Sequence, residues 1–168
     1  MSKKGYLTAA EYKTIRQFLG FSQQEAAEFH NVQNVRTIKR WENGDSWVSE
    51  LACDKITKLL KQIQWTIGQA VERYRELPHA QETSVVLITY PDNCLAKFVP
   101  NWGNLPASVH RAMIAHTYTA LKELGADVGI VVFNPQDYFT YLAAHNLSDG
   151  QDSRSAWACD YRSRLMLN

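Results

Sequence analysis

Residues 34–42 gather side chains that hydrogen-bond readily to nucleic acid. Arg and Lys donate to phosphate oxygens and to guanine, while Asn and Thr side chains contact base edges. Such donors occupy most of the stretch, as Asn34, Arg36, Thr37, Lys39 and Arg40. A short helix that carries them on one side could enter a major groove.

The same stretch also has an apolar side, which indicates how it would be held. Val35, Ile38 and Trp41 recur at steps of three, so they share the face opposite the donors. A preceding helix must cross closely, and Ala27 provides the small residue needed for that crossing. Asn31 tolerates the left-handed backbone of a tight turn. The pattern therefore predicts a helix-turn-helix with its second helix over about 34–42.

Start and stop signals frame two short helices before this one. Thr8-Ala9-Ala10-Glu11 and Ser22-Gln23-Gln24-Glu25 are both capping boxes, and Gly20-Phe21 is expected to join the two helices tightly. Asn43-Gly44 predicts a left-handed end to the third helix. Glu42 is expected to fix that end or to pair with a nearby basic residue.

A longer apolar stripe follows from about Ser49 and predicts a long helix, either continuous or broken near Gly68. The polar, Pro-containing stretch 77–84 reads as a linker. We therefore expect a DNA-binding domain over 1–77 and a C-terminal dimerisation or accessory region over 78–168.

The second half mixes strands with helices. Apolar runs predict buried strands over 85–88 and 128–133. Turn chemistry at Pro91-Asp92-Asn93 predicts that 95–99 pairs back as a hairpin. Helices are expected from Pro106 to Gly125, from Pro135 onward and over 155–166. The fold class predicted is α+β, mainly α, with a helical domain followed by a small mixed α/β part.

These residues carry a family resemblance. The segment 21–29 followed by Ile38-Lys39-Arg40-Trp41-Glu42-Asn43-Gly44 resembles the lambda-repressor-like (Cro/C1-type, XRE) helix-turn-helix family, whose motif ends Ile-x-x-Trp-Glu-x-Gly. The resemblance covers about residues 6–70. One extra residue lies in the turn, as is typical of the YdiL-like and anti-CRISPR-associated (Aca) regulators, and Glu25-Ala26-Ala27-Glu28 is similar to theirs. The C-terminal part of this chain is also similar to theirs. Most of 78–126 is then interpreted as an insertion relative to the short members of that group.

The resemblance implies a homodimer that binds an inverted-repeat operator and represses transcription. It assigns base contact to Arg36 and its neighbours. Gln23 and Gln24, at the start of the preceding helix, would meet phosphate. Lys39 and Arg40 would supply salt-sensitive phosphate contacts. The base-contacting set is Arg36 with Asn34, Thr37 and Arg40.

Charge is divided along the chain in a way that suits such a role. The chain has 168 residues and a formal net charge of +1. Residues 1–75 hold twelve Lys/Arg and eight Asp/Glu, whereas residues 76–168 hold six and nine. A polyanion would therefore meet the first half.

Other function classes receive less support. No spacing of His, Cys or acidic residues predicts a metal site, a cofactor or catalytic residues. The absence of a long apolar run and of a signal peptide predicts a soluble, cytoplasmic protein. Three alternatives stay open: a small-molecule effector site near 91–104 and 134–137, an antitoxin-like partner protein, and an enzyme using Asp137 with His145 or His110.

Overall fold

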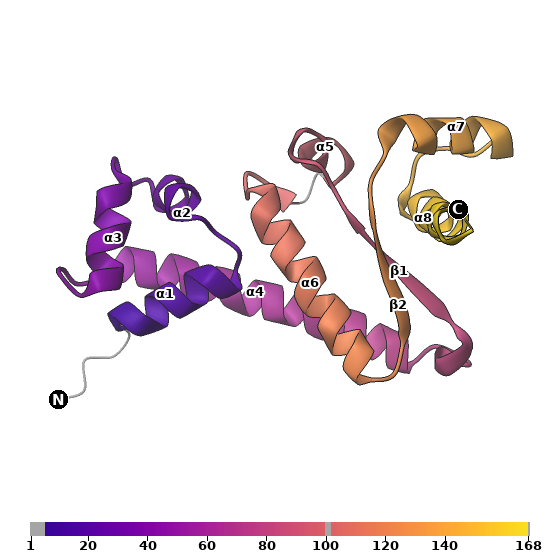
Figure 1. The fold of residues 1–168 in the computed structure, drawn as a ribbon. Helices are drawn as coiled ribbons and strands as arrows, with labels where there is room; N and C mark the ends of the chain where they lie inside the picture. Colours follow the sequence, from indigo (N-terminus) through magenta and orange to yellow (C-terminus); the bar gives the residue numbers. More distant parts are fainter. Residues whose placement is uncertain (1–5, 100–101, 168) are drawn as a thin grey trace. The chain divides into compact units, whose positions relative to one another are not determined.

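The computed structural model describes residues 6–99 and 102–167, and it is mainly helical with one small sheet (Figure 1). The chain forms two compact units. The N-terminal unit comprises the chain up to Gly68 together with Gly103–Met113, and the sheet unit comprises Gln69–Trp102 together with the chain from Ile114 onward. The predicted α+β, mainly α class is confirmed. The functional division at residue 77 stays a prediction.

Three short helices open the N-terminal unit: α1 (Ala9–Phe18), α2 (Gln23–His30) and α3 (Val35–Asn43). Both predicted capping boxes are present. At the first, the Thr8 N–H donates to Glu11 Oε2 at 2.7 Å and the Glu11 N–H donates back to Thr8 Oγ1 at 3.2 Å. Each helix start therefore satisfies its own amides. The unit's core contains Tyr12, Leu19, Phe21, Ile38, Trp41 and Ile56.

The fourth helix, α4 (Glu50–Arg75), is a single helix that continues through Gly68. Its portion in the N-terminal unit buries residues three and four apart, so one stripe faces the core. The helix is therefore continuous at Gly68, where the sequence was compatible with either a continuous or a broken helix. The buried residues are Ala52, Cys53, Ile56, Leu59 and Ile63.

A distant segment completes the N-terminal unit. The helix α6 (Ala107–Glu123) follows Pro106, as predicted, and its first residues belong to this unit. Ser108 Oγ donates to Glu25 Oε1 on α2 at 2.8 Å. Gly20, with φ +80°, lies so close to α6 that a Cβ there would be 2.7 Å from the Ser108 carbonyl oxygen and from Ala112 Cβ. A residue without a side chain is therefore required at this crossing.

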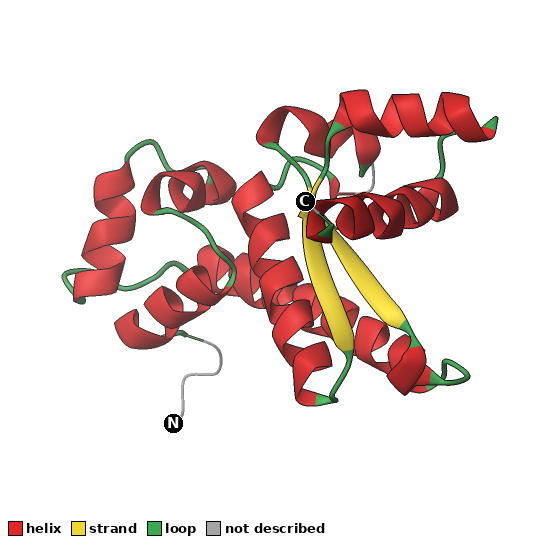
Figure 2. Cartoon of the chain, turned by 45° about the vertical axis from the view of Figure 1, so that its right-hand side comes forward, coloured by secondary structure: helices red, strands yellow, loops and turns green. Residues whose placement is uncertain are grey.

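Two parallel strands form the sheet of the second unit, β1 (Ser84–Thr89) and β2 (Asp127–Val132) (Figure 2). Their register runs from Ser84 opposite Asp127 to Thr89 opposite Val132. A short 3₁₀ turn, η1 (Ala80–Glu82), precedes β1. Because parallel strands need a long crossover, the intervening chain is helical.

The predicted hairpin of 95–99 is wrong. Those residues largely form α5 (Asp92–Phe98), and β1 pairs instead with β2. Cys94, Leu95 and Phe98 share one face of this helix and are buried. Phe98 packs on Phe133, with ring centroids 4.5 Å apart. That aromatic packing favours a helix over the strand that the turn chemistry suggested.

Helices cover both faces of the sheet. Val128 packs with Tyr74 of α4 and Leu121 of α6. The neighbouring Gly129 faces the opposite side, where Arg162 of α8 (Gln151–Met166) lies against it. Arg162 donates to Ser84 Oγ at 2.7 Å and to Asp127 Oδ1 at 3.1 Å, and thereby joins α8 to both strands.

The last two helices pack through aromatic rings. Pro135 opens α7 (Pro135–His145), as predicted, and the structure shows that Asn134 caps this helix. Tyr138 lies 5.2 Å from Phe133, centroid to centroid, and 5.8 Å from Trp157 of α8. The last helix starts one turn earlier than predicted. Among the described helices, none combines the length and apolar character needed to span a bilayer.

Candidate nucleic-acid interface

The turn between α2 and α3 has the geometry that its residues predict (Figure 1). Asn31 ends α2 in the left-handed region with φ +55°, and the Val32 N–H donates to the Ala27 carbonyl at 3.0 Å. Asn34 begins α3, and its Oδ1 accepts from the Arg36 N–H at 2.8 Å. Gly44 ends α3 with φ +78°, so the predicted left-handed end is confirmed.

The apolar side of α3 holds the helix against the core. Ile38 is fully buried and Trp41 nearly so, whereas Val35 is half-buried. Trp41 contacts Tyr12 edge to face at 5.4 Å between ring centroids and His30 at 5.8 Å. The predicted inward direction of these residues is therefore confirmed, most completely for Ile38 and Trp41.

The opposite side of α3 carries three exposed cations, Arg36, Lys39 and Arg40. Across the described part of the chain, none of these three forms an ion pair. Their charge is therefore available to an incoming anion without first breaking an internal contact. Thr37 is half-buried beside them, and Asn34 is exposed.

A buried polar network fixes the other end of α3. Arg16 of α1 pairs with Glu42 and also donates to the Phe21 carbonyl in the α1–α2 connection. Gln23 Nε2 donates to Glu42 Oε2 at 2.8 Å. One carboxylate thus links the first three helices, so the prediction that Glu42 pairs with a basic residue is confirmed.

Three of the candidate residues have structural roles as well. The side chain of Gln23 is half-buried and is held by Glu42, while Gln24 Nε2 donates to Glu28 Oε1 at 3.0 Å. Asn34 acts as the N-cap of α3, a role that the preference for Asn at that position could have indicated. The predicted contacts of Gln23 and Gln24 with phosphate, and of Asn34 with a base, stay predictions.

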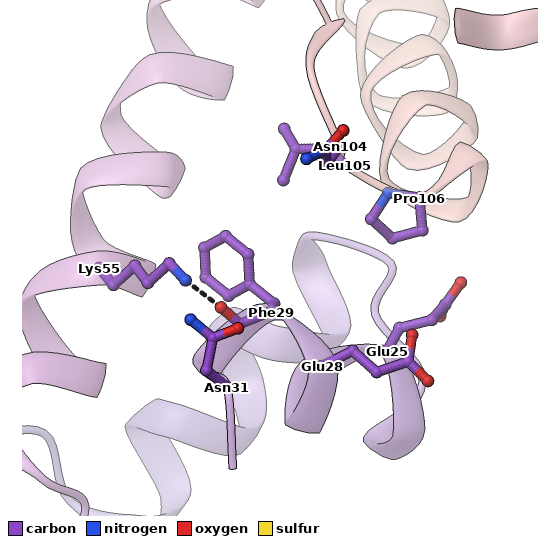
Figure 3. Close-up of a pocket in the computed structure, with 8 residues that line it drawn as sticks. All are labelled: Glu25, Glu28, Phe29, Asn31, Lys55, Asn104, Leu105 and Pro106. Carbon is purple, nitrogen blue, oxygen red and sulfur yellow. Dashed lines mark hydrogen bonds between the residues drawn. The ribbon is translucent and has the colours of Figure 1, made fainter. Parts of the chain in front are cut away.

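A pocket of about 580 Å³ lies beside α2 in the N-terminal unit (Figure 3). Lys55 Nζ donates to the Phe29 carbonyl and lies 4.4 Å from the centroid of the Phe29 ring. Although burial favours the neutral acid, hydrogen bonds from Ser22 and Ser108 lower the pKa of Glu25. The lining residues are Glu25, Glu28, Phe29, Asn31, Lys55, Asn104, Leu105 and Pro106.

The residues considered for chemistry in the sheet unit have structural partners. Asp137 accepts from Trp157 Nε1 at 2.7 Å and from Arg164, and these bonds lower its pKa, the bond from Arg164 most. His145 lies against Tyr141, with ring centroids 4.3 Å apart. Within the described ranges, no three His, Cys, Asp or Glu side chains gather as metal ligands would.

Comparison with known protein families identifies the family of this chain. A family model described as Aca2/YdiL-like matches residues 7–119, which is more than half of the chain. The match runs through most of 78–126, and the reading of that stretch as an insertion stays a prediction. No curated protein matches the chain. The chain therefore belongs to the Aca2/YdiL-like family.

Proposed function

We propose that this chain is a sequence-specific transcriptional regulator, a homodimeric repressor that binds an inverted repeat in double-stranded DNA. The α2–turn–α3 segment acts as a lambda-repressor-like helix-turn-helix, with α3 as its recognition helix. The observation that carries the proposal is the two-sided character of α3. Ile38 and Trp41 hold one side in the core, and three unpaired cations cover the other.

Each candidate contact has a distinct role in this proposal. Arg36 reads a base edge in the major groove, together with its neighbours, because a guanidinium can donate two bonds to guanine. Lys39 supplies charge to phosphate and releases counterions on binding. The start of α2, with Gln23 and Gln24, meets phosphate through its backbone amides and its positive helix end. The base-reading neighbours are Asn34, Thr37 and Arg40.

Homodimerisation follows from the small size of the reading surface. One helix of this length contacts only a few base pairs, so two copies are needed for useful specificity. A two-fold axis would place the half-sites about 34 Å apart, or a multiple of that distance. Repression then occurs by occlusion of a promoter that overlaps the operator.

The test begins by selecting bound duplexes from a random DNA pool with the full chain. On the selected duplex, Arg36→Ala should lower affinity by about 5- to 150-fold, since one bidentate contact with a base is worth about 1–3 kcal/mol. Lys39→Ala should weaken binding to all duplexes alike and reduce the salt slope by about 1.

Lys61→Ala is the matched control, because Lys61 is also exposed but lies on α4. It should leave affinity for the selected duplex close to that of the wild type. If Arg36→Ala binds that duplex as tightly as Lys61→Ala does, the role assigned to Arg36 is refuted. If the pool yields no enriched sequence, sequence-specific binding itself is refuted.

A second candidate, an effector-responsive regulator, is favoured by the pocket beside α2. Its lining includes Phe29 near the end of α2 and Asn31, the left-handed residue that sets the turn into α3. With two carboxylates and one ammonium around an aromatic ring, the site suits a small amphipathic cation or zwitterion. A thermal-shift screen of such compounds, repeated with Phe29→Ala, tests it.

A further inference from the structure

The outer edge of β2 has unpaired backbone groups. In the described residues the sheet has two strands, so each strand has only one partner. The Phe133 N–H, directly after β2, donates to the Thr89 carbonyl at 2.8 Å, so its backbone faces β1. Because amides alternate sides along a strand, the N–H and C=O groups of Val128, Ile130 and Val132 point away from β1.

The same edge is apolar and exposed. Ile130 is 42% exposed and Val132 is 62% exposed, whereas β1 carries no large exposed apolar side chain. Exposed edges are usually protected by Lys, Pro or a bulge. The sequence Asp127-Val128-Gly129-Ile130-Val131-Val132 contains neither Lys nor Pro, and its register with β1 is continuous.

A groove of about 510 Å³ borders this edge. Tyr118 and Lys122 of α6 line one part of it, and Leu165 and Met166 of α8 line another. Leu165 is 56% exposed and Met166 is 75% exposed, so α8 presents two apolar side chains to the groove, beside Arg162. An extended strand lying in this groove would pair its backbone with β2 and would cover the apolar side chains.

We propose that β2 of a second copy of this chain fills the groove, antiparallel to the first, around a two-fold axis at Ile130. The two sheets would then join into one sheet of four strands. The inference deepens the homodimer of the proposed function and rests on it, because an inverted repeat calls for a two-fold axis.

The register at Ile130 is self-complementary. Ile130 faces Ile130 of the partner subunit, and Val128 faces Val132 of the partner subunit. The three residues of each strand whose backbone groups point away from β1 are therefore all paired. The pairing supplies about six backbone hydrogen bonds between subunits. Like charges do not face each other, because Asp127 lies opposite Phe133 of the partner subunit.

A charge-swap experiment on the full chain tests this register. Ile130→Lys and Ile130→Glu are each expected to stay folded, since the side chain is 42% exposed. Each alone places like charges at the axis, which should raise the dimer dissociation constant about a hundredfold or more. An equimolar mixture should restore a heterodimer, with a dissociation constant within about tenfold of the wild type, by sedimentation equilibrium.

Leu147→Lys is the matched control, because Leu147 is 43% exposed but lies outside the strands. It should dimerise like the wild type. The proposal is overturned if the wild-type chain is monomeric at tens of micromolar. That is the result expected if the groove binds a peptide from another protein. It is also overturned if Ile130→Lys dimerises normally, or if the mixture of Ile130→Lys and Ile130→Glu stays monomeric.

Measuring binding to the selected duplex separately keeps the two proposals apart. A chain that dimerises through β2 but enriches no sequence leaves this interface standing and refutes the proposed function. A chain that binds its operator while Ile130→Lys still dimerises refutes this interface and leaves the proposed function standing.

Discussion

Acid should destabilise the N-terminal unit through His30, and replacing this residue tests that expectation. The imidazole is buried between Tyr12 and Trp41, and neither ring nitrogen has a hydrogen-bond partner in the described structure. Burial, and to a lesser extent the nearby Lys55 ammonium, lowers its pKa from 6.5 to about 4. The folded unit therefore holds the neutral form, whereas the unfolded chain gains a proton as the pH falls through 6.5.

The size of the effect follows from that pKa. Lowering the pKa from 6.5 to about 4 corresponds to about 3 kcal/mol of unfolding free energy, at about 1.4 kcal/mol for each pKa unit. This stability is fully present above pH 6.5, is lost progressively as the pH falls and stops changing below about pH 4. At pH 4.5 the loss should be about 2–3 kcal/mol.

His30→Leu should remove this loss. The substitution replaces two unpaired buried nitrogens with an apolar side chain of similar size, so it should be neutral or stabilising at pH 7. Urea unfolding followed through tryptophan fluorescence, at pH values from 7 to 4.5, measures the change. His110, whose pKa burial also lowers to about 4, should retain its own part of the pH dependence.

His145→Leu is the control, since it removes an exposed imidazole from α7. It should keep the wild-type slope of stability against pH. A His30→Leu variant whose slope equals that of the wild type would refute the assignment of the acid sensitivity to this residue.

Two further predictions concern the packing of the N-terminal unit. Glu42→Ala leaves Arg16 buried without its carboxylate and should cost about 3–5 kcal/mol, whereas the double replacement Arg16→Met with Glu42→Leu should recover much of that loss in a thermal melt. Equal melts for wild type and Glu42→Ala would contradict this role. Gly20→Ala should destabilise clearly more than Gly44→Ala, which shares a positive φ but has no atom within 4 Å of the added Cβ. Equal costs in denaturant unfolding would show that the crossing with α6 relaxes freely.

Local signals predicted the N-terminal unit well. Its helix starts are set by Thr8 and Ser22, whose capping partners lie three residues away, and its turn is set by Asn31. The inward direction of Ile38 and Trp41 followed from helical periodicity alone. Such features depend on residues that are close together in the sequence, so they can be predicted from the sequence alone.

Features that depend on distant partners could not be predicted in this way. The residues at 92–98 form a helix because Phe98 meets Phe133, which is far away in sequence. The sequence suggested that Glu42 has a basic partner, but only the fold selects Arg16. Nothing near Gly20 in sequence indicates that Ser108 and Ala112 pack against it.

The order of chain synthesis gives the segment at 103–113 a particular consequence. Ser108 and Ala112 complete the N-terminal unit, although α1, α2 and α3 precede them by more than sixty residues. While translation proceeds, the nascent helices cannot close this contact until the ribosome has made and released α6. The unit should therefore mature late, and protease protection of stalled nascent chains should rise only after the codons for these residues have been read.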